Sequence, residues 1–426
     1  MKVSATLTMA LLAAFLLLSA GAWAGSAPGL PELISEALSR NREVLAARAA
    51  WQAAGERPSQ ARALPDPQLS VGVMNLPTSL RFNDEPMTMK QVQVSQMFPW
   101  FGKRELRGDA AGQEAEAARQ RYIEAANRVV RELREVYYEF FFVAQQAQLV
   151  EANLGVLSQF IEVAKAAYVS GLGKQADILR AQTQHARMID ERLMVERERI
   201  MVAARLRSLL DRPAGSLIEP PQSLPATEPP SWSSDELLEL ALEQRPMLKE
   251  AQAMTQARRR EIELARKEYW PDFEIMAAYG QRGEVMGSQI DDMLSTAVSI
   301  NVPLWQDSKL DPMLREAKQA ERQAVESYQA GVNEIEFELW QALAKATRAK
   351  ESLALYNTGI LPQARLTVES SLSGYRVGTL DFLSLLEAQM NLYASEVARA
   401  RALTDYSQAV AEIDYIIGSQ PPGEAK

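Results

Sequence analysis

The sequence predicts a mainly α-helical protein with a small β part, built from long helical hairpins in an internal two-fold repeat. The phrase "YVSGLGKQADILRAQ", from Tyr168 to Gln182, is matched by "YRVGTLDFLSLLEAQ", from Tyr375 to Gln389, with Tyr, Gly, Leu, Ala and Gln in register. Elsewhere, long helix-forming stretches are almost free of proline, and four short segments alternate apolar and polar residues. Self-similarity at one period indicates a repeated architecture, so each element is sought in two copies.

The amino terminus has the pattern of a secretory signal peptide. Lys2 is followed by an apolar run from Leu7 to Leu18 and by the small-residue site Ala22-Trp23-Ala24, which is typical of a signal cleaved after residue 24. The alternative is an N-terminal membrane anchor, but the run is short for a membrane span. The organisation expected is a signal peptide at 1–24, a first repeat at 25–211, a Pro-rich linker at 212–233, a second repeat at 234–418 and a tail at 419–426.

The composition excludes several classes of site. The chain has no cysteine, one histidine and a formal net charge of -9, so we expect neither a disulfide framework nor a His/Cys metal site. His185 lies in the polar helical stretch "RAQTQHARMIDERL", where a solvated role is expected, and no set of carboxylates is singled out by spacing. We therefore expect no enzyme activity and no cofactor, and the acidic balance argues against a nucleic-acid partner.

Each copy begins with a helical segment that ends at a Pro-Asp pair. The segments are 31–64 and 234–269, with Ser233 or Ser234 as N-cap of the second. The prolines at the ends disfavour further helix. We expect one continuous helix in each copy.

Two alternating segments follow in each copy. They cover 68–75, 90–98, 272–280 and 295–302. A period of two over about ten residues predicts strands with one apolar and one mostly polar face.

Long helices come next. From 104 to 169 there is no proline, which corresponds to roughly 95–100 Å of helix at 1.5 Å per residue. The second copy runs from 312 to 372 with one interruption at Pro362. Each ends at a glycine-containing break, 170–173 or 374–378, before a return helix to about 210 or 417. The repeated phrase is therefore the tip of a helical hairpin, where glycine permits the turn.

Aromatic residues gather where helices meet strands. This pattern is typical of the interface girdles of membrane β-barrels, and the alternative is ordinary apolar capping between helix and sheet. Because four strands cannot close a barrel and open edges are excluded from lipid, the strands require partner chains. The residues concerned are Phe98, Trp100, Phe101, Tyr269, Trp270 and Trp305.

The repeat spacing, the Pro-Asp strand starts and the "YRVGTLDFLSLLEAQ" tip together resemble the outer-membrane efflux protein family of TolC-like channels, over the whole mature chain. The resemblance implies a homotrimer with a twelve-stranded outer-membrane β-barrel and a helical periplasmic tunnel. It also implies a periplasmic adaptor, an inner-membrane pump of the RND type, and a function as the exit duct of a tripartite efflux system. "PDPQLSVGVMNLP" and "MTMKQVQVSQMFPWFGK" look like the heavy-metal efflux branch.

The family resemblance also assigns residues at the hairpin tips. An acid at the Asp177 position bonds the tyrosine at the Tyr375 position across hairpins, and both residues are present here. The basic residue that the family's TolC channel carries at the Leu380 position is absent. Of two acidic positions facing the pore, Ser384 has replaced one and Glu387 keeps the other, so we expect a single ring of three carboxylates. By analogy, the adaptor would dock on Ser170, Gly171, Leu172, Gly173, Val377, Gly378 and Thr379.

The sequence alone leaves open both the transported substrate and the functional class of the protein. Met74, Met87, Met89 and Met97 surround the first strand pair, and thioethers are soft ligands suited to Cu(I). The alternative is that they pack against loops or lipid. A soluble periplasmic coiled-coil scaffold or adaptor is the second function class, although it leaves the apolar strand faces unexplained.

Overall fold

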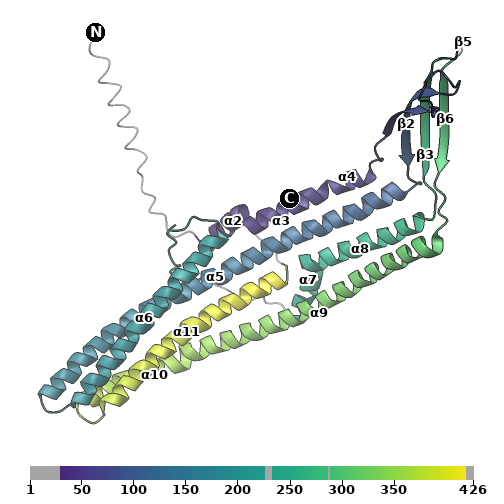
Figure 1. The fold of residues 1–426 in the computed structure, drawn as a ribbon. Helices are drawn as coiled ribbons and strands as arrows, with labels where there is room; N and C mark the ends of the chain where they lie inside the picture. The colour runs from purple at the N-terminus through teal and green to yellow at the C-terminus, as the bar shows by residue number, and fades with distance from the viewer. Residues whose placement is uncertain (1–28, 226–232, 286–287, 419–426) are drawn as a thin grey trace, which may run out of the picture. The chain divides into compact units, whose positions relative to one another are not determined.

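The computed structural model describes residues 29–225, 233–285 and 288–418. The expected signal peptide, the tail at 419–426 and residues 226–232 of the linker lie outside the described residues. The described elements, labelled in Figure 1, are α2 (Leu30–Arg40), α3 (Arg42–Gly55), α4 (Arg57–Arg62), β1 (Gln68–Met74), β2 (Met89–Phe98), α5 (Lys103–Val169), α6 (Gln175–Leu209), α7 (Ser234–Gln244), α8 (Pro246–Lys267), β3 (Phe273–Arg282), β4 (Glu284–Val285), β5 (Ser288–Gln289), β6 (Met293–Ile300), η1 (Gln306–Leu310), α9 (Asp311–Leu355), η2 (Tyr356–Ile360), α10 (Leu361–Arg376) and α11 (Phe382–Ile416).

The prediction of one continuous opening helix in each copy is wrong. Asn41 separates α2 from α3, because its side-chain oxygen accepts hydrogen bonds from the backbone N–H groups of Glu43 (2.9 Å) and Val44 (3.3 Å) and caps a new helix. In the second copy Arg245 separates α7 from α8 with extended backbone angles (φ -58°, ψ 121°). Pro246 follows it, and the residue before a proline disfavours the helical conformation.

The chain divides into two compact units, and each is described by itself. The first comprises Met1–Ala37, Leu133–Ala226 and Tyr356–Thr404. The second comprises Leu38–Glu132, Thr227–Leu355 and Asp405–Lys426.

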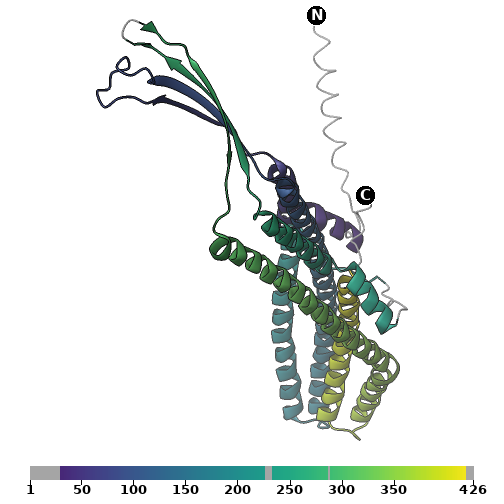
Figure 2. The same cartoon turned by 90° about the vertical axis from the view of Figure 1, so that its right-hand side faces the viewer.

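The first unit is a bundle of two helical hairpins, α5–α6 and α10–α11, whose turns lie at the same end (Figure 2). Towards the tip of α5, four fully buried residues recur every seven residues: Val143, Val150, Leu157 and Ala164 are all 0% exposed. Ala181, Met188 and Val195 repeat the same interval on α6 and are also buried. A seven-residue apolar repeat is the pattern of coiled-coil packing, in which one stripe of each helix faces its partner. None of the described helices is both long enough and apolar enough to cross a membrane.

Two local details differ from the sequence prediction. The interruption at Pro362 is a five-residue π-helical turn, Tyr356–Ile360, placed just ahead of the proline. Proline removes one backbone donor and crowds the preceding turn, which widens it. The second tip begins later than expected, because Gly374 is still helical and α10 ends at Arg376.

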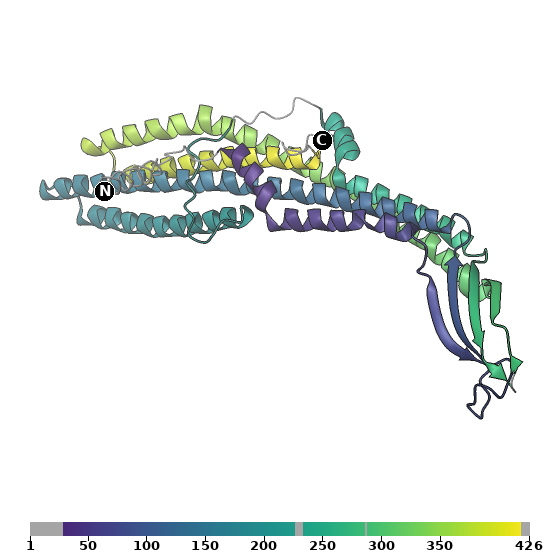
Figure 3. The same ribbon diagram turned by 90° about the horizontal axis from the view of Figure 1, so that it is seen from above.

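The second unit contains one antiparallel sheet of four strands in the order β1-β2-β3-β6 (Figures 1 and 3). The central pairing, β2 with β3, joins the two sequence copies, with Val94 opposite Ala277 and Phe98 opposite Phe273. The helical core of this unit is formed by α7, α8, α9 and the end of α11. Its buried positions on α9 follow alternating steps of three and four: Ile335, Leu339, Ala342, Ala346 and Ala349.

A buried arginine lies within this helical core. Arg245 is 2% exposed. Its guanidinium lies 3.8 Å from the ring centroid of Tyr415, 3.0 Å from a carboxylate oxygen of Glu124 and 4.0 Å from Glu338, and it donates to the backbone oxygen of Tyr415 (2.7 Å). The hydroxyl of Tyr415 donates in turn to Glu124 (2.7 Å). The kink at Arg245 therefore places a charge where α5, α9 and α11 meet.

Candidate functional site

The sheet has one apolar and one polar face, and its register aligns the apolar side chains across all four strands. Val71 lies opposite Val92, and Val92 lies opposite Tyr279, which in turn lies opposite Leu294. These side chains are uncovered, since Val71 is 76% and Leu294 is 77% exposed. A contiguous exposed apolar surface of this kind marks contact with another protein or with lipid. Its exposed members are Leu69, Val71, Val73, Val92, Val94, Ile275, Tyr279, Leu294, Val298 and Ile300.

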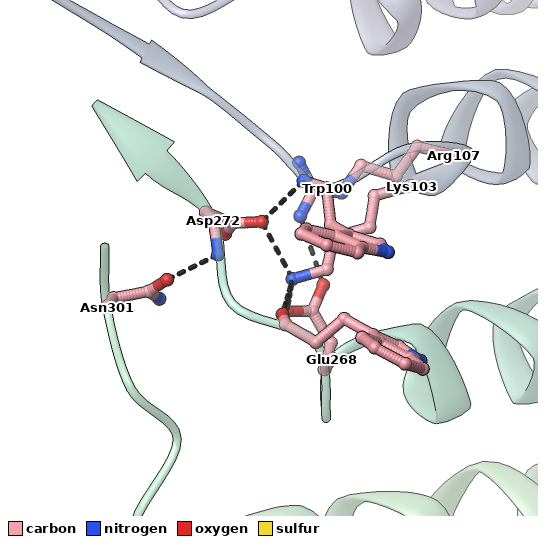
Figure 4. Close-up of polar contacts among 7 residues, drawn as sticks. Trp100, Lys103, Arg107, Glu268, Asp272 and Asn301 are labelled. Atoms are coloured by element: carbon pink, nitrogen blue, oxygen red, sulfur yellow. Dashed lines mark hydrogen bonds and ion pairs between the residues drawn. The ribbon is translucent and has the colours of Figure 1, made fainter. Parts of the chain in front are cut away.

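Lys103 holds the sheet to the helices (Figure 4). Its side chain is 1% exposed, and its ammonium donates to Glu268 (2.9 Å), to Asp272 (2.9 Å) and to the backbone oxygen of Trp270 (3.1 Å). Asp272 also accepts from the backbone N–H of Trp100 (2.7 Å). All three ammonium protons have acceptors, as a buried lysine requires. This cluster, Lys103–Glu268–Asp272, ties the end of β2 and the start of α5 to the end of α8 and the start of β3.

Sequence reasoning missed this cluster. The signal was available, because Lys103 stands between the aromatic stretch "FPWFG" and the helix, and Asp272 belongs to the Pro-Asp pair that starts β3. Nothing in the spacing, however, says that two residues 169 positions apart meet.

The six expected interface aromatics occupy different environments. Trp100 stacks on Trp270 at 5.3 Å and Phe98 stacks on Phe273 at 5.4 Å. Phe101 and Trp305 are both 72% exposed. Tyr269 instead donates a hydrogen bond to Asp311 at the start of α9, which places its hydroxyl in a contact within the chain.

The hairpin tips are short turns centred on glycines with left-handed backbone. Gly171 has φ +78° and Gly378 has φ +76°, a region that side chains with a Cβ atom disfavour. Both turns are exposed, and Leu172 (88%) and Val377 (74%) project apolar side chains from them. The expected docking residues therefore lie on an accessible surface of the first unit.

Asp177 and Tyr375 come together in the first unit but do not form the expected hydrogen bond within the chain. The Asp177 carboxylate accepts from the backbone N–H of Lys174 (3.3 Å) and caps α6. The Tyr375 hydroxyl is buried with no hydrogen-bond partner among the described residues, and its ring packs edge-on against Phe382 at 5.4 Å. Burial, followed by the negative charge of Asp177, raises the pKa of Tyr375, so the hydroxyl keeps its proton and remains a free donor.

Ser384 and Glu387 are both exposed on α11. A third residue, Asp381, was not singled out from the sequence, although it precedes the helix as an N-cap does. Its carboxylate accepts from the backbone N–H of Ser384 (3.0 Å). The contacts with Ser384 and then the charges of Arg180 and Lys174 lower the pKa of Asp381, so this tip carries an ionised carboxylate.

The structure offers no clustered metal site in the part of the chain that it describes, where no three His, Asp or Glu side chains are grouped to hold an ion. Met74 pairs across the strands with Met89. Met97 lies opposite Glu274, on the polar face of the sheet, and is 46% exposed. The methionines are thus spread along the strands.

Solved structures of outer-membrane channels share this fold, with long helical hairpins and an open sheet. The solved structure of the outer-membrane channel OprN matches with a TM-score of 0.80 and 20% identity, covering 92% of this chain and 90% of that one. The channel CusC matches with a TM-score of 0.78 and 19% identity, covering 91% and 92%.

The family follows from the sequence comparison. The model of the outer membrane efflux protein family matches residues 33–212 and 237–419, so the chain belongs to this family. Among curated relatives, the cobalt-zinc-cadmium resistance protein CzcC of Cupriavidus metallidurans is 22% identical over 361 residues, 84% of this chain and 82% of the relative. The outer membrane protein TolC of Vibrio cholerae is 20% identical over 420 residues, 94% and 92% of the two chains.

Proposed function

We propose that the chain forms a homotrimeric exit duct, which passively conducts substrates from the periplasm to the exterior as part of a pump–adaptor–channel assembly. The observation that carries this proposal is the sheet, whose described edge strands β1 and β6 each pair on one side only while its apolar face is uncovered. In lipid every backbone donor and acceptor needs a partner. Three chains supply twelve strands and pair all the edges, and the apolar face then contacts lipid.

The helices support the same assembly. Large apolar side chains on α6 and α9 are uncovered in the single chain, among them Leu193 (62%), Ile200 (57%), Phe337 (60%) and Trp340 (51%). Packing such side chains between neighbouring chains removes them from water, at about 25 cal/mol per Å² buried. The soluble scaffold, the alternative function, leaves both these side chains and the apolar sheet face in water.

The test is the native mass of protein extracted with detergent from an outer-membrane fraction. Three chains per particle, with pore activity after reconstitution into a planar bilayer, are expected. Recovery as a monomer in the soluble periplasmic fraction would contradict the duct and favour the scaffold.

At the tips, we infer that the buried Tyr375 hydroxyl finds its acceptor on a neighbouring hairpin when the trimer closes, with an Asp177 carboxylate as the candidate. A buried donor left unpaired costs about 1–3 kcal/mol, so a closing contact that satisfies it is favoured.

We expect Asp177→Ala and Tyr375→Phe each to raise single-channel conductance several-fold, because each removes one side of this contact. Tyr168→Phe is the matched control, since Tyr168 occupies the same position in the first copy but is 48% exposed. Conductance that rises equally in all three variants, or in none, would argue against the latch.

Three copies of the exposed Glu387 would form a ring of carboxylates at the narrow end of the tunnel. We expect Glu387→Gln to lower the preference for cations over anions, measured as a shift of reversal potential toward zero in a KCl gradient. Glu369→Gln on the exposed side of α10 is the control. An unchanged reversal potential would place Glu387 outside the conduction path.

The exposed tip turns would dock the adaptor, and the pump would be of the RND type. For the cargo we propose metal ions ahead of drug-like compounds, supported by the similarity to CzcC. We expect cells that lack this chain to lose tolerance to cobalt, zinc and cadmium, and to recover it when the chain is expressed. Loss of drug tolerance alone would favour drug-like compounds over metal ions as the cargo.

A further inference from the structure

A cavity of about 500 Å³ opens beside the Lys103–Glu268–Asp272 cluster, where the first turns of α5 pass the last turns of α8. It is lined by both signs of charge and by one indole. The side chains that matter are Glu105, Asp109, Glu263, Arg266, Lys267 and Trp270.

Two of the acidic groups already have partners. Asp109 is paired with Arg62 (2.7 Å) and Glu263 with Arg260 (3.0 Å). The side chains of Glu105, Arg266 and Lys267 make no hydrogen bond or ion pair with any other described residue. The cavity therefore presents two cations and one carboxylate that are available to a ligand.

The cavity is continuous with the apolar face of the sheet through a chain of aromatic contacts. Phe273, on that face, lies 6.2 Å from Phe101, which lies 5.6 Å from Trp100. Trp100 stacks on Trp270 in the cavity wall, and Trp270 is 53% exposed. Indole side chains prefer the level of lipid headgroups, because one end is apolar and the other can hydrogen-bond.

We propose that this cavity binds the headgroup of an ethanolamine glycerophospholipid. Arg266 and Lys267 would hold the phosphate diester, for which guanidinium and ammonium groups are suited donors. Glu105 would accept hydrogen bonds from the primary ammonium of the headgroup. Trp270 would lie against the glycerol, and the acyl chains would run along the apolar strand face.

Hydrogen-bond complementarity, and not the net charge, selects the ligand. A phosphatidylglycerol headgroup offers no cation of its own to Glu105, whose carboxylate would then compete with the phosphate for Arg266 and Lys267, and the trimethylammonium of phosphatidylcholine has no N–H to donate. The ethanolamine headgroup offers a phosphate to Arg266 and Lys267 and a primary ammonium to Glu105. This inference rests on the proposed membrane-embedded duct and adds a specific lipid site to it.

The test uses the full-length, detergent-extracted and delipidated protein, titrated with an equimolar mixture of phosphatidylethanolamine, phosphatidylglycerol and phosphatidylcholine, with bound lipid counted by native mass spectrometry. The wild type should retain phosphatidylethanolamine in preference to the other two. Arg266→Gln with Lys267→Gln should weaken its binding about tenfold or more, the scale of one or two charge-assisted hydrogen bonds. Glu105→Gln should abolish the preference for ethanolamine over choline.

The control is Arg348→Gln with Lys350→Gln, which removes the same charge from an exposed stretch of α9 and should leave lipid binding unchanged. Soluble phosphoethanolamine should compete only weakly, because it lacks the acyl chains. Equal retention of the three lipids, or unchanged binding in the Arg266/Lys267 variant, would overturn the site. If phosphoethanolamine competed as strongly as the lipid does, the cavity would bind the free headgroup, and a membrane lipid would be ruled out as its specific ligand.

Native mass and bilayer conductance measured on the same preparation separate the two levels of inference. A conducting trimer that shows no preference for phosphatidylethanolamine would contradict the headgroup site alone. A monomer without pore activity would contradict the proposed duct as well.

Discussion

Lys103→Met is expected to lower the free energy of unfolding by about 3–5 kcal/mol, because it leaves the partly buried Asp272 without its cation and Glu268 with Arg107 alone. Lys103 is 1% exposed, whereas Glu268 and Asp272 are 20% and 18% exposed, so water can replace the ammonium only in part. The measurement is the thermal midpoint of the detergent-extracted protein, together with the amount of protein recovered from the outer membrane.

Two comparisons make this prediction specific. Lys309→Met removes an exposed lysine from the turn before α9 and should change the midpoint little. Adding Glu268→Gln and Asp272→Asn to Lys103→Met should recover part of the loss, since no partly buried carboxylate then lacks its lysine. A triple variant that is less stable than Lys103→Met would show that the carboxylates stabilise the protein through their other partners, the Trp100 N–H and Arg107, more than the missing lysine costs.

Arg245→Met is the second substitution with a large expected effect, again about 3–5 kcal/mol of unfolding free energy. It removes a 2%-exposed guanidinium from between Glu124, Glu338 and the Tyr415 ring. Arg259→Met on α8, the helix that follows Arg245, is the control. Arg259 is 53% exposed and pairs with Glu321 at 3.3 Å, a surface ion pair worth about 0–1 kcal/mol. Equal effects of the two substitutions would contradict a special role of the buried arginine.

The effect of Arg245→Met should depend on pH. Burial raises the pKa of Glu338 above its ordinary value of 4.5, while the charge of Arg245 lowers it. A carboxyl whose pKa is higher in the folded than in the unfolded state opposes folding once it is ionised, so its cost appears as pH rises from 4.5 through the folded value. Removing Arg245 raises that folded pKa further. The loss of stability should therefore be smaller at pH 5 than at pH 7.5, and Glu338→Gln should weaken this dependence.

The two faces of the strands could be predicted from the sequence alone. Side chains alternate between the two faces of a strand, so the period-two segments alone predicted which residues share a face. The register confirms this for Phe273, Ile275, Ala277 and Tyr279 on β3, which lie opposite Ile300, Val298, Thr296 and Leu294 on β6. The opening helices show the opposite case. Their composition predicted continuous helix. The helices instead break at Asn41, whose side chain caps a new helix, and at Arg245, which precedes a proline, and these local effects outweigh the helix propensity of the surrounding residues.

By itself the sequence determined the two copies, the long hairpins, the strand faces and the resemblance to the family. Each of these depends on residue type and spacing within a few turns of chain, or on direct comparison of one stretch with another. Only the tertiary structure decided that Lys103 meets Asp272, that Arg245 lies against Tyr415, and that the Tyr375 hydroxyl is buried beside Asp177 without bonding it. Those outcomes depend on distances between residues far apart in the chain, which packing and the burial of charge set and which no local period encodes.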